Sequence, residues 1–174
     1  HENGWRVEGD PMEGALQALA GKLMRTGTKT FIEWTRTDSI PFDASHRYMA
    51  VLHHDHEGHA CINVKGAPER IIQMCMDQRA PNGETQPLDA DYWHAQADTI
   101  AAQGQRVLAL ATRTVPQEHV TLNNSDLEGQ VTLIGLVGLI DPPRREAITA
   151  VAECHEAGIR VKMITGDHAG TARA

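Results

Sequence analysis

The sequence predicts an α+β protein, in which an antiparallel twisted sheet is flanked by helices and a partial α/β segment follows. Up to about residue 130, helical patterns alternate with short β-rich segments bounded by turn residues, which is typical of antiparallel sheets. From there on the order is strand, helix, strand, which is the order of a βαβ unit with parallel strands. These two patterns predict two domains, 1–128 and 129–174.

The composition favours one compact core and a locally built binding site. The 174 residues are 41% hydrophobic, and the formal net charge of -7 argues against a general nucleic-acid or anionic-membrane surface. The three cysteines have no CxxC spacing, so we expect free thiols. The longest apolar run, 131–140, has about half of the ~20 residues that a membrane helix needs, and we expect a buried strand there and no membrane segment.

The first helix is predicted over 11–25. Asp10 is a suitable N-cap, Pro11 occupies the first helical position, and apolar residues follow at helical spacing. Strands rich in β-branched or aromatic residues are expected at 31–38, 47–54 and 59–65, and the last two form a predicted hairpin.

Three further helices and three further strands complete the prediction. The helices are expected at 67–77, 89–103 and 144–157, and the strands at 106–114, 131–139 and 159–164. The last strand pair and the helix between them form the βαβ unit, whose parallel strands need a cover of helices.

Five strings carry the functional signal. They are Gly-Asp-Pro-Met-Glu-Gly-Ala-Leu at 9–16, Ile-Pro-Phe-Asp at 40–43, Val-Lys-Gly-Ala-Pro-Glu at 64–69, Asp-Pro-Pro-Arg at 141–144 and Met-Ile-Thr-Gly-Asp at 163–167. The last two each follow an apolar run and open a predicted helix, which in an α/β sheet is where phosphates bind. Lys65 stands at a strand end beside Gly66, which lets a ligand approach the backbone, although a solvated lysine explains Lys65 alone equally well.

In this order the strings resemble those of P-type ATPases, the ATP-driven cation pumps, and the resemblance covers 9–174. It implies a nucleotide-binding domain followed by the start of the phosphorylation domain, whose fold is haloacid-dehalogenase-like. The first string is most similar to the type II pumps for calcium or for sodium and potassium. The Asp-Lys-Thr-Gly-Thr segment that carries the family's phosphorylated aspartate does not occur in the sequence.

The resemblance implies an ATP site in the first domain. Phe42 matches the phenylalanine that stacks on adenine, and Arg47 matches the basic residue five positions later that contacts the nucleotide. Lys65 and Gly66 match the lysine and glycine of the ATP pocket. A core ring beside a turn remains the alternative for Phe42.

Two more residues of the first domain are implied as ATP ligands. Glu13 matches a glutamate that hydrogen-bonds the adenine amino group, and the alternative is a carboxylate that satisfies amides of its own helix. Arg106 matches an arginine that reaches the polyphosphate or the ribose, and the alternative is a surface arginine on the exposed face of its strand.

The resemblance also implies part of a phosphoryl-transfer centre in the second domain. Thr165 and Asp167 take the catalytic positions, in which the threonine holds the phosphoryl group, and Asp141 and Gly166 join them at the nucleotide. Mg²⁺ would accompany ATP in the parent pump. The fragment, which lacks the nucleophilic aspartate, is expected to be inactive by itself.

The segment 53–59 contains four histidines, His53, His54, His56 and His59. Because alternating directions along a hairpin separate neighbouring imidazoles, we favour a solvated turn over a metal site and expect no metal ligands in this chain.

The resemblance thus implies the ATP-binding cytosolic domain of an integral membrane cation pump, located in the cell membrane of a bacterial parent. The parent would couple ATP hydrolysis through an aspartyl-phosphate to cation transport. Its partners would be ATP and the remaining phosphorylation, actuator and transmembrane domains, and not nucleic acid. A haloacid-dehalogenase-like phosphatase and a non-catalytic interaction module of the same fold are the alternatives.

Overall fold

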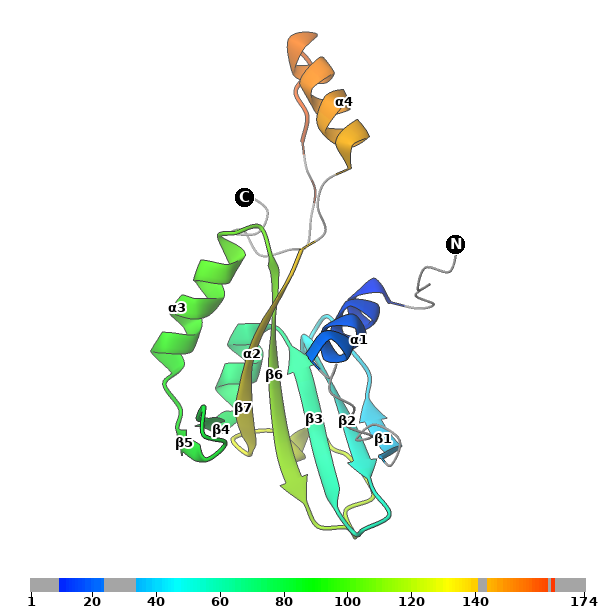
Figure 1. The fold of residues 1–174 in the computed structure, drawn as a ribbon, viewed down its shortest axis with the longest axis vertical. Helices are drawn as coiled ribbons and strands as arrows, with labels where there is room; N and C mark the ends of the chain where they lie inside the picture. Colours follow the sequence, from blue (N-terminus) through cyan, green and yellow to red (C-terminus); the bar gives the residue numbers. More distant parts are fainter. Residues whose placement is uncertain (1–9, 24–33, 141–143, 163, 165–174) are drawn as a thin grey trace.

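The protein forms one seven-stranded mixed sheet flanked by helices (Figure 1). The computed structural model describes residues 10–23, 34–140, 144–162 and 164. Its strands are β1 (Thr35–Ile40), β2 (Tyr48–His54), β3 (Ala60–Gly66), β4 (Cys75–Arg79), β5 (Thr85–Pro87), β6 (Arg106–Val115) and β7 (Val131–Leu139). Its helices are α1 (Pro11–Leu23), α2 (Pro68–Met74), α3 (Ala90–Ala101) and α4 (Arg145–Glu156), with a short 3-10 helix η1 (Asn124–Asp126). The predicted α+β class is confirmed.

The sheet order is β1-β2-β3-β6-β7-β4-β5. The pairs from β1 to β7 in this order are antiparallel, whereas β7 and β4 are parallel. Gly66 at the end of β3 lies between Tyr48, at the start of β2, and Ala109, near the start of β6. Three segments that are distant in sequence therefore meet at one end of the sheet.

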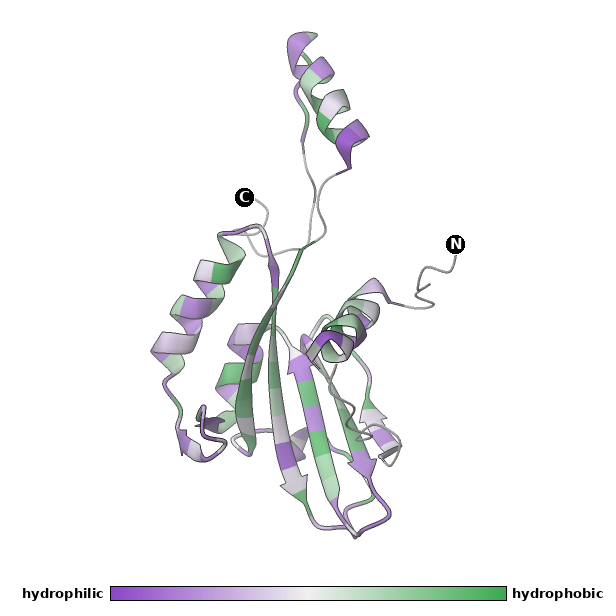
Figure 2. Cartoon of the chain, viewed as in Figure 1, coloured by the Kyte–Doolittle hydropathy of each residue, from purple (hydrophilic) through white to green (hydrophobic). Residues whose placement is uncertain are grey.

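The core lies on the face of the sheet that α2 covers. Alternate residues of β2 and β3 are buried there. Hydrophobic and hydrophilic residues also alternate along part of β3 (Figure 2). Tyr48 is 1% exposed, and its hydroxyl donates a hydrogen bond to Asn124 Oδ1 at 2.9 Å. Ile71 and Met74 of α2 are fully buried in the same cluster. The side chains at the intervening positions of β2 and β3 point to the opposite face of the sheet.

Two strands, β4 and the edge strand β5, were not predicted. The expected helix 67–77 ends at Met74, and Cys75–Arg79 continues as β4 beside β7. Gln78 is 7% exposed because its Oε1 accepts hydrogen bonds from the Trp93 indole at 2.7 Å and from the Asp89 backbone at 2.8 Å. These partners lie 11 and 15 residues away, beyond the reach of a local pattern.

The predicted βαβ unit differs from the structure. The strand at 131–139 is confirmed as β7, but β7 is antiparallel to β6 within the same sheet. The prediction of a strand at 159–164 is wrong for the residues of this range that the structure describes. These residues are exposed and have no neighbouring strand to supply ladder hydrogen bonds. The division of the chain at residue 128 remains a prediction, and the sheet continues across it.

The remaining expectations concern the helices and the thiols. The helices predicted at 89–103 and 144–157 are confirmed as α3 and α4, although no residue of α4 is buried. All three cysteines are free, as predicted, and burial raises the pKa of the Cys75 thiol to about 12. In the described part of the chain, no helix combines the length and the apolar character needed to cross a membrane.

Gly66 is required by the close approach of β2. A Cβ at this position would lie 2.5 Å from the carbonyl oxygen of Arg47 and 2.7 Å from Cα of Tyr48. We expect Gly66→Ala to lower the free energy of unfolding by about 1–3 kcal/mol, because paired backbone has little room to yield. Urea denaturation measures this change. Gly21→Ala in α1 is the control, since nothing lies within 4 Å of its added Cβ, and equal losses in both variants would contradict the explanation.

Candidate functional site

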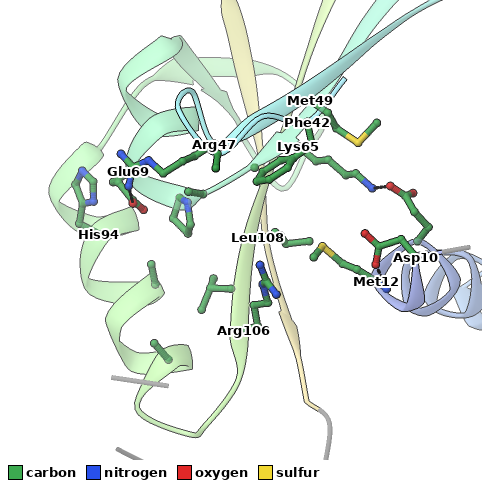
Figure 3. A pocket seen from close by; sticks show the side chains of 18 of the residues that line it. Asp10, Met12, Phe42, Arg47, Met49, Lys65, Glu69, His94, Arg106 and Leu108 are labelled. Carbon is green, nitrogen blue, oxygen red and sulfur yellow. Dashed lines mark hydrogen bonds and ion pairs between the residues drawn. The ribbon is translucent and has the colours of Figure 1, made fainter. Parts of the chain in front are cut away.

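A cavity of about 850 Å³ opens at the end of the sheet where β3 ends and β2 and β6 begin. Its size falls within the range of about 300–1,000 Å³ that is usual for small-molecule sites. Helices α1 and α3 and the loop between β1 and β2 also contribute to its wall (Figure 3). All six predicted site residues that the structure describes line it: Glu13, Phe42, Arg47, Lys65, Gly66 and Arg106.

The strand register directs Lys65 into the cavity. Its neighbours Val64 and Gly66 face the core, so Lys65 points to the opposite face, as does Met49, its partner across the ladder. The side chain is only 17% exposed, which excludes the solvated-lysine interpretation. Its Nζ donates a hydrogen bond to Glu13 Oε1 on α1.

Glu13 is available for this pairing because another residue caps α1. The Asp10 carboxylate accepts a hydrogen bond from the Met12 backbone N–H at 2.9 Å, as expected for an N-cap. Glu13 therefore forms an ion pair between α1 and β3, and its carboxylate stays 47% exposed. In Figure 3, the Asp10 and Met12 side chains lie on the α1 side of the cavity, opposite Arg47 and Glu69.

Phe42 lies in the loop between β1 and β2, and its ring is not part of the core. It is 61% exposed and lines the cavity, so its face is accessible to a ligand. Asp43 organises the loop: its carboxylate accepts hydrogen bonds from the backbone N–H and the hydroxyl of Ser45, which lower the pKa of Asp43. Its carbonyl oxygen accepts a hydrogen bond from the Arg47 N–H at 2.7 Å.

Arg47 has a left-handed backbone, with φ of 60°. Its carbonyl oxygen accepts a hydrogen bond from the Ala67 N–H at 3.0 Å, which connects the loop to the start of α2. Its guanidinium Nη1 lies 2.5 Å from Glu69 Oε1, and both side chains are about half exposed. The backbone of Arg47 is thus fixed from two sides, whereas its charged group lies at the surface of the cavity.

Arg106 is the first residue of β6 and pairs with Leu139 of β7 in the ladder. Its side chain lies at the cavity beside Leu108 in Figure 3. The α3 residues His94 and Asp98 also line the cavity, although no sequence motif indicated them. Their place depends on how α3 packs against the sheet, which no local string encodes.

The other predicted site residues lie outside the described part of the chain. They are Asp141, Thr165, Gly166 and Asp167. Their assignment to nucleotide binding and to phosphoryl transfer stays a prediction.

The histidine-rich segment forms a tight turn between β2 and β3. Asp55 Oδ1 accepts hydrogen bonds from the backbone N–H groups of Glu57 at 2.9 Å and His59 at 2.8 Å, and Oδ2 lies 2.7 Å from His59 Nδ1. Within the described ranges, Asp55, Glu57 and His59 form the one group whose potential metal-ligating atoms lie within 4.8 Å of one another. The turn hydrogen bonds account for this clustering without an ion.

The sequence model of the family described as "P-type ATPase, cytoplasmic domain N" matches residues 1–146. The chain therefore belongs to this family.

Several curated relatives are similar over nearly the whole chain. The cation-transporting ATPase pma1 of Synechocystis sp. is 45% identical over 170 residues, which are 98% of this chain and 19% of that protein. The sodium/potassium exporting P-type ATPase cta3 of Schizosaccharomyces pombe is 40% identical, over 98% of this chain and 16% of that protein. A calcium-transporting ATPase of Bacillus subtilis is 34% identical, over 97% and 19%. The chain thus spans less than a fifth of the length of these relatives.

The Asp55–His59 pair predicts different titrations for two histidines of one hairpin. Asp55 raises the pKa of His59 by hydrogen bonding and by its charge, whereas burial and the charge of Arg36 lower the pKa of His53. In an NMR titration we expect His59 to protonate above the ordinary value of about 6.5 and His53 below it. The Asp55–His59 pair should contribute its full stabilisation at pH values below the pKa that His59 has in the unfolded chain. This contribution should be lost as the pH rises through the pKa of His59 in the folded protein.

The control for this titration is Asp55→Asn. This variant should return the pKa of His59 toward its ordinary value and leave His53 unchanged. A His59 midpoint at or below that of His53 in the unmodified protein would contradict the hydrogen bond.

Proposed function

We propose that this chain binds ATP in the cavity, with the adenine ring on Phe42 and the phosphates at Lys65, Arg47 and Arg106. The observation that carries the proposal is that residues from α1, β3, β6 and the β1–β2 loop, chosen from separate sequence strings, all line one cavity. An exposed aromatic ring and several cations are the groups that a nucleotide requires.

The geometry favours weak and reversible binding. Phe42 offers one exposed face, and the cations lie at the wall of an open cavity rather than in a closed cage. The helix α2 after Gly66 has seven residues, so its N-terminus adds little charge. We expect a dissociation constant near the millimolar level, which corresponds to about -4 kcal/mol.

For the whole protein we propose a type II pump that couples ATP hydrolysis, through an aspartyl-phosphate, to cation transport. The support is the family membership and the names of the relatives, which include calcium-transporting and sodium/potassium exporting ATPases. This chain would be a cytoplasmic domain of that membrane protein, with the remaining phosphorylation, actuator and transmembrane domains as its partners. Mg²⁺ would act with ATP in the parent, and we assign it no ligand among the described residues.

A titration with ATP, followed by backbone amide chemical shifts, tests the proposal. Shifts should concentrate around Phe42, Lys65 and Gly66 and saturate at millimolar ATP. If these amides do not move, the chain is a non-catalytic interaction module of the same fold. Release of phosphate from ATP by the isolated chain would contradict the proposal that hydrolysis needs the whole pump.

Removal of the aromatic ring should weaken ATP binding. Base stacking is worth about 1–3 kcal/mol, so Phe42→Ala should raise the dissociation constant by about five- to a hundredfold. The ring is 61% exposed, and its loss should leave the fold intact. His56→Ala, in the β2–β3 turn outside the cavity, is the control, and equal effects of the two substitutions would undermine the proposed adenine position.

Removal of the charge of Lys65 should weaken ATP binding more than adenosine binding. A charge-assisted hydrogen bond contributes about 1.5–3 kcal/mol, so Lys65→Gln should raise the dissociation constant for ATP about tenfold or more. Lys22→Gln makes the same charge change in the last turn of α1 and does not touch the cavity. Equal losses for ATP and adenosine in Lys65→Gln would place the lysine away from the phosphates.

A further inference from the structure

Two of the three cations of the cavity are paired with carboxylates from other elements of the chain. Lys65 of β3 pairs with Glu13 of α1, and Arg47 of the loop pairs with Glu69 of α2. A polyphosphate that approaches either cation must replace a carboxylate that already neutralises it.

The charges around the cavity add to this competition. The acidic side chains in the wall are those of Asp10, Glu13, Glu69 and Asp98, and the basic ones are those of Arg47, Lys65 and Arg106. With four acidic and three basic groups, the wall as a whole does not attract a polyanion. Attraction therefore depends on which cations are released from their partners.

The Arg47–Glu69 pair is built so that it can exchange. The backbone of Arg47 is held by Asp43 and Ala67, so a change of partner needs only a rotation of its side chain. The side chains of Arg47 and Glu69 are 51% and 49% exposed, and no wall encloses the pair. An exposed pair of this kind is weak, which means that a phosphate can displace the carboxylate at low cost.

We propose that Glu69 lowers the ATP affinity of the cavity, because its carboxylate holds the Arg47 guanidinium until a nucleotide phosphate replaces it. This inference rests on the proposed nucleotide function. Binding is then an exchange of one anion for another on Arg47, and the strength of the Arg47–Glu69 pair sets part of the ATP affinity.

The test compares ATP titrations of the 174-residue chain and of Glu69→Gln, again by amide chemical shifts. Glu69→Gln keeps the size of the side chain and removes its charge, so Arg47 is free for the phosphates. Because exposed pairs contribute little, we expect ATP to bind about two- to fivefold more tightly. Adenosine, which has no phosphate, should bind with unchanged affinity.

Glu128→Gln is the matched control. Glu128 also pairs with an arginine, Arg70, and is 48% exposed, but neither residue lines the cavity. The substitution makes the same change in net charge, so a general effect of charge would tighten ATP binding equally in both variants. Equal tightening overturns the proposal.

A double variant, Glu69→Gln combined with Arg47→Gln, tests whether Glu69 acts through Arg47. If Glu69 acts through Arg47, Glu69→Gln should give no further tightening once Arg47 is replaced. Tightening that persists in this background assigns the effect to direct repulsion between Glu69 and the phosphates, and it overturns the proposal. Weaker ATP binding in Glu69→Gln would also overturn the proposal, since it would mean that the Glu69 carboxylate orients Arg47 for the ligand.

The outcomes also separate this inference from the proposed function. If the unmodified chain gives no shifts with ATP, the nucleotide function itself fails. If it binds ATP and Glu69→Gln binds with the same affinity, the nucleotide function stands and the role of Glu69 is overturned.

Discussion

The antiparallel ladder that joins β2, β3 and β6 positions both the core and the cavity of this protein. It places Gly66 between Tyr48 and Ala109, and so brings the start of two strands and the end of a third to the same place. The backbones approach so closely there that a side chain at position 66 has no room. Burial of alternate residues on the α2 face then sends Lys65 and Met49 to the cavity, so the core and the site follow from one register.

Ion pairs determine the electrostatic properties of the cavity wall. Arg47 and Lys65 pair with carboxylates on neighbouring elements, which joins α1 to β3 and the β1–β2 loop to α2. The Arg47–Glu69 pair is about half exposed and contributes little to stability, so it is free to exchange partners. A site of this kind combines a well-defined position for the proposed nucleotide with modest affinity.

Much of the site could be predicted because its strings are short and local. Asp10 and Pro11 define the start of α1, and the Lys65-Gly66 pair marks a strand end. What could not be predicted depends on contacts between distant segments. Arg47 and Glu69 are 22 residues apart, Gln78 accepts a hydrogen bond from Trp93, 15 residues further along, and β4 pairs with the distant β7 as well as with β5.

The predicted site residues that line the cavity were indicated by the resemblance of their sequence motifs to the P-type ATPases. The pattern of residue types alone predicted the α+β class, the β2–β3 hairpin and the limits of most helices. These features follow from spacing along the chain, where backbone geometry fixes which neighbours share a face. The folded structure was needed to show that 131–139 joins the sheet antiparallel to β6, and which carboxylate neutralises which cation. Strand partners and ion pairs are chosen by packing across long sequence separations, and the local pattern of β7 is compatible with either a parallel or an antiparallel neighbour.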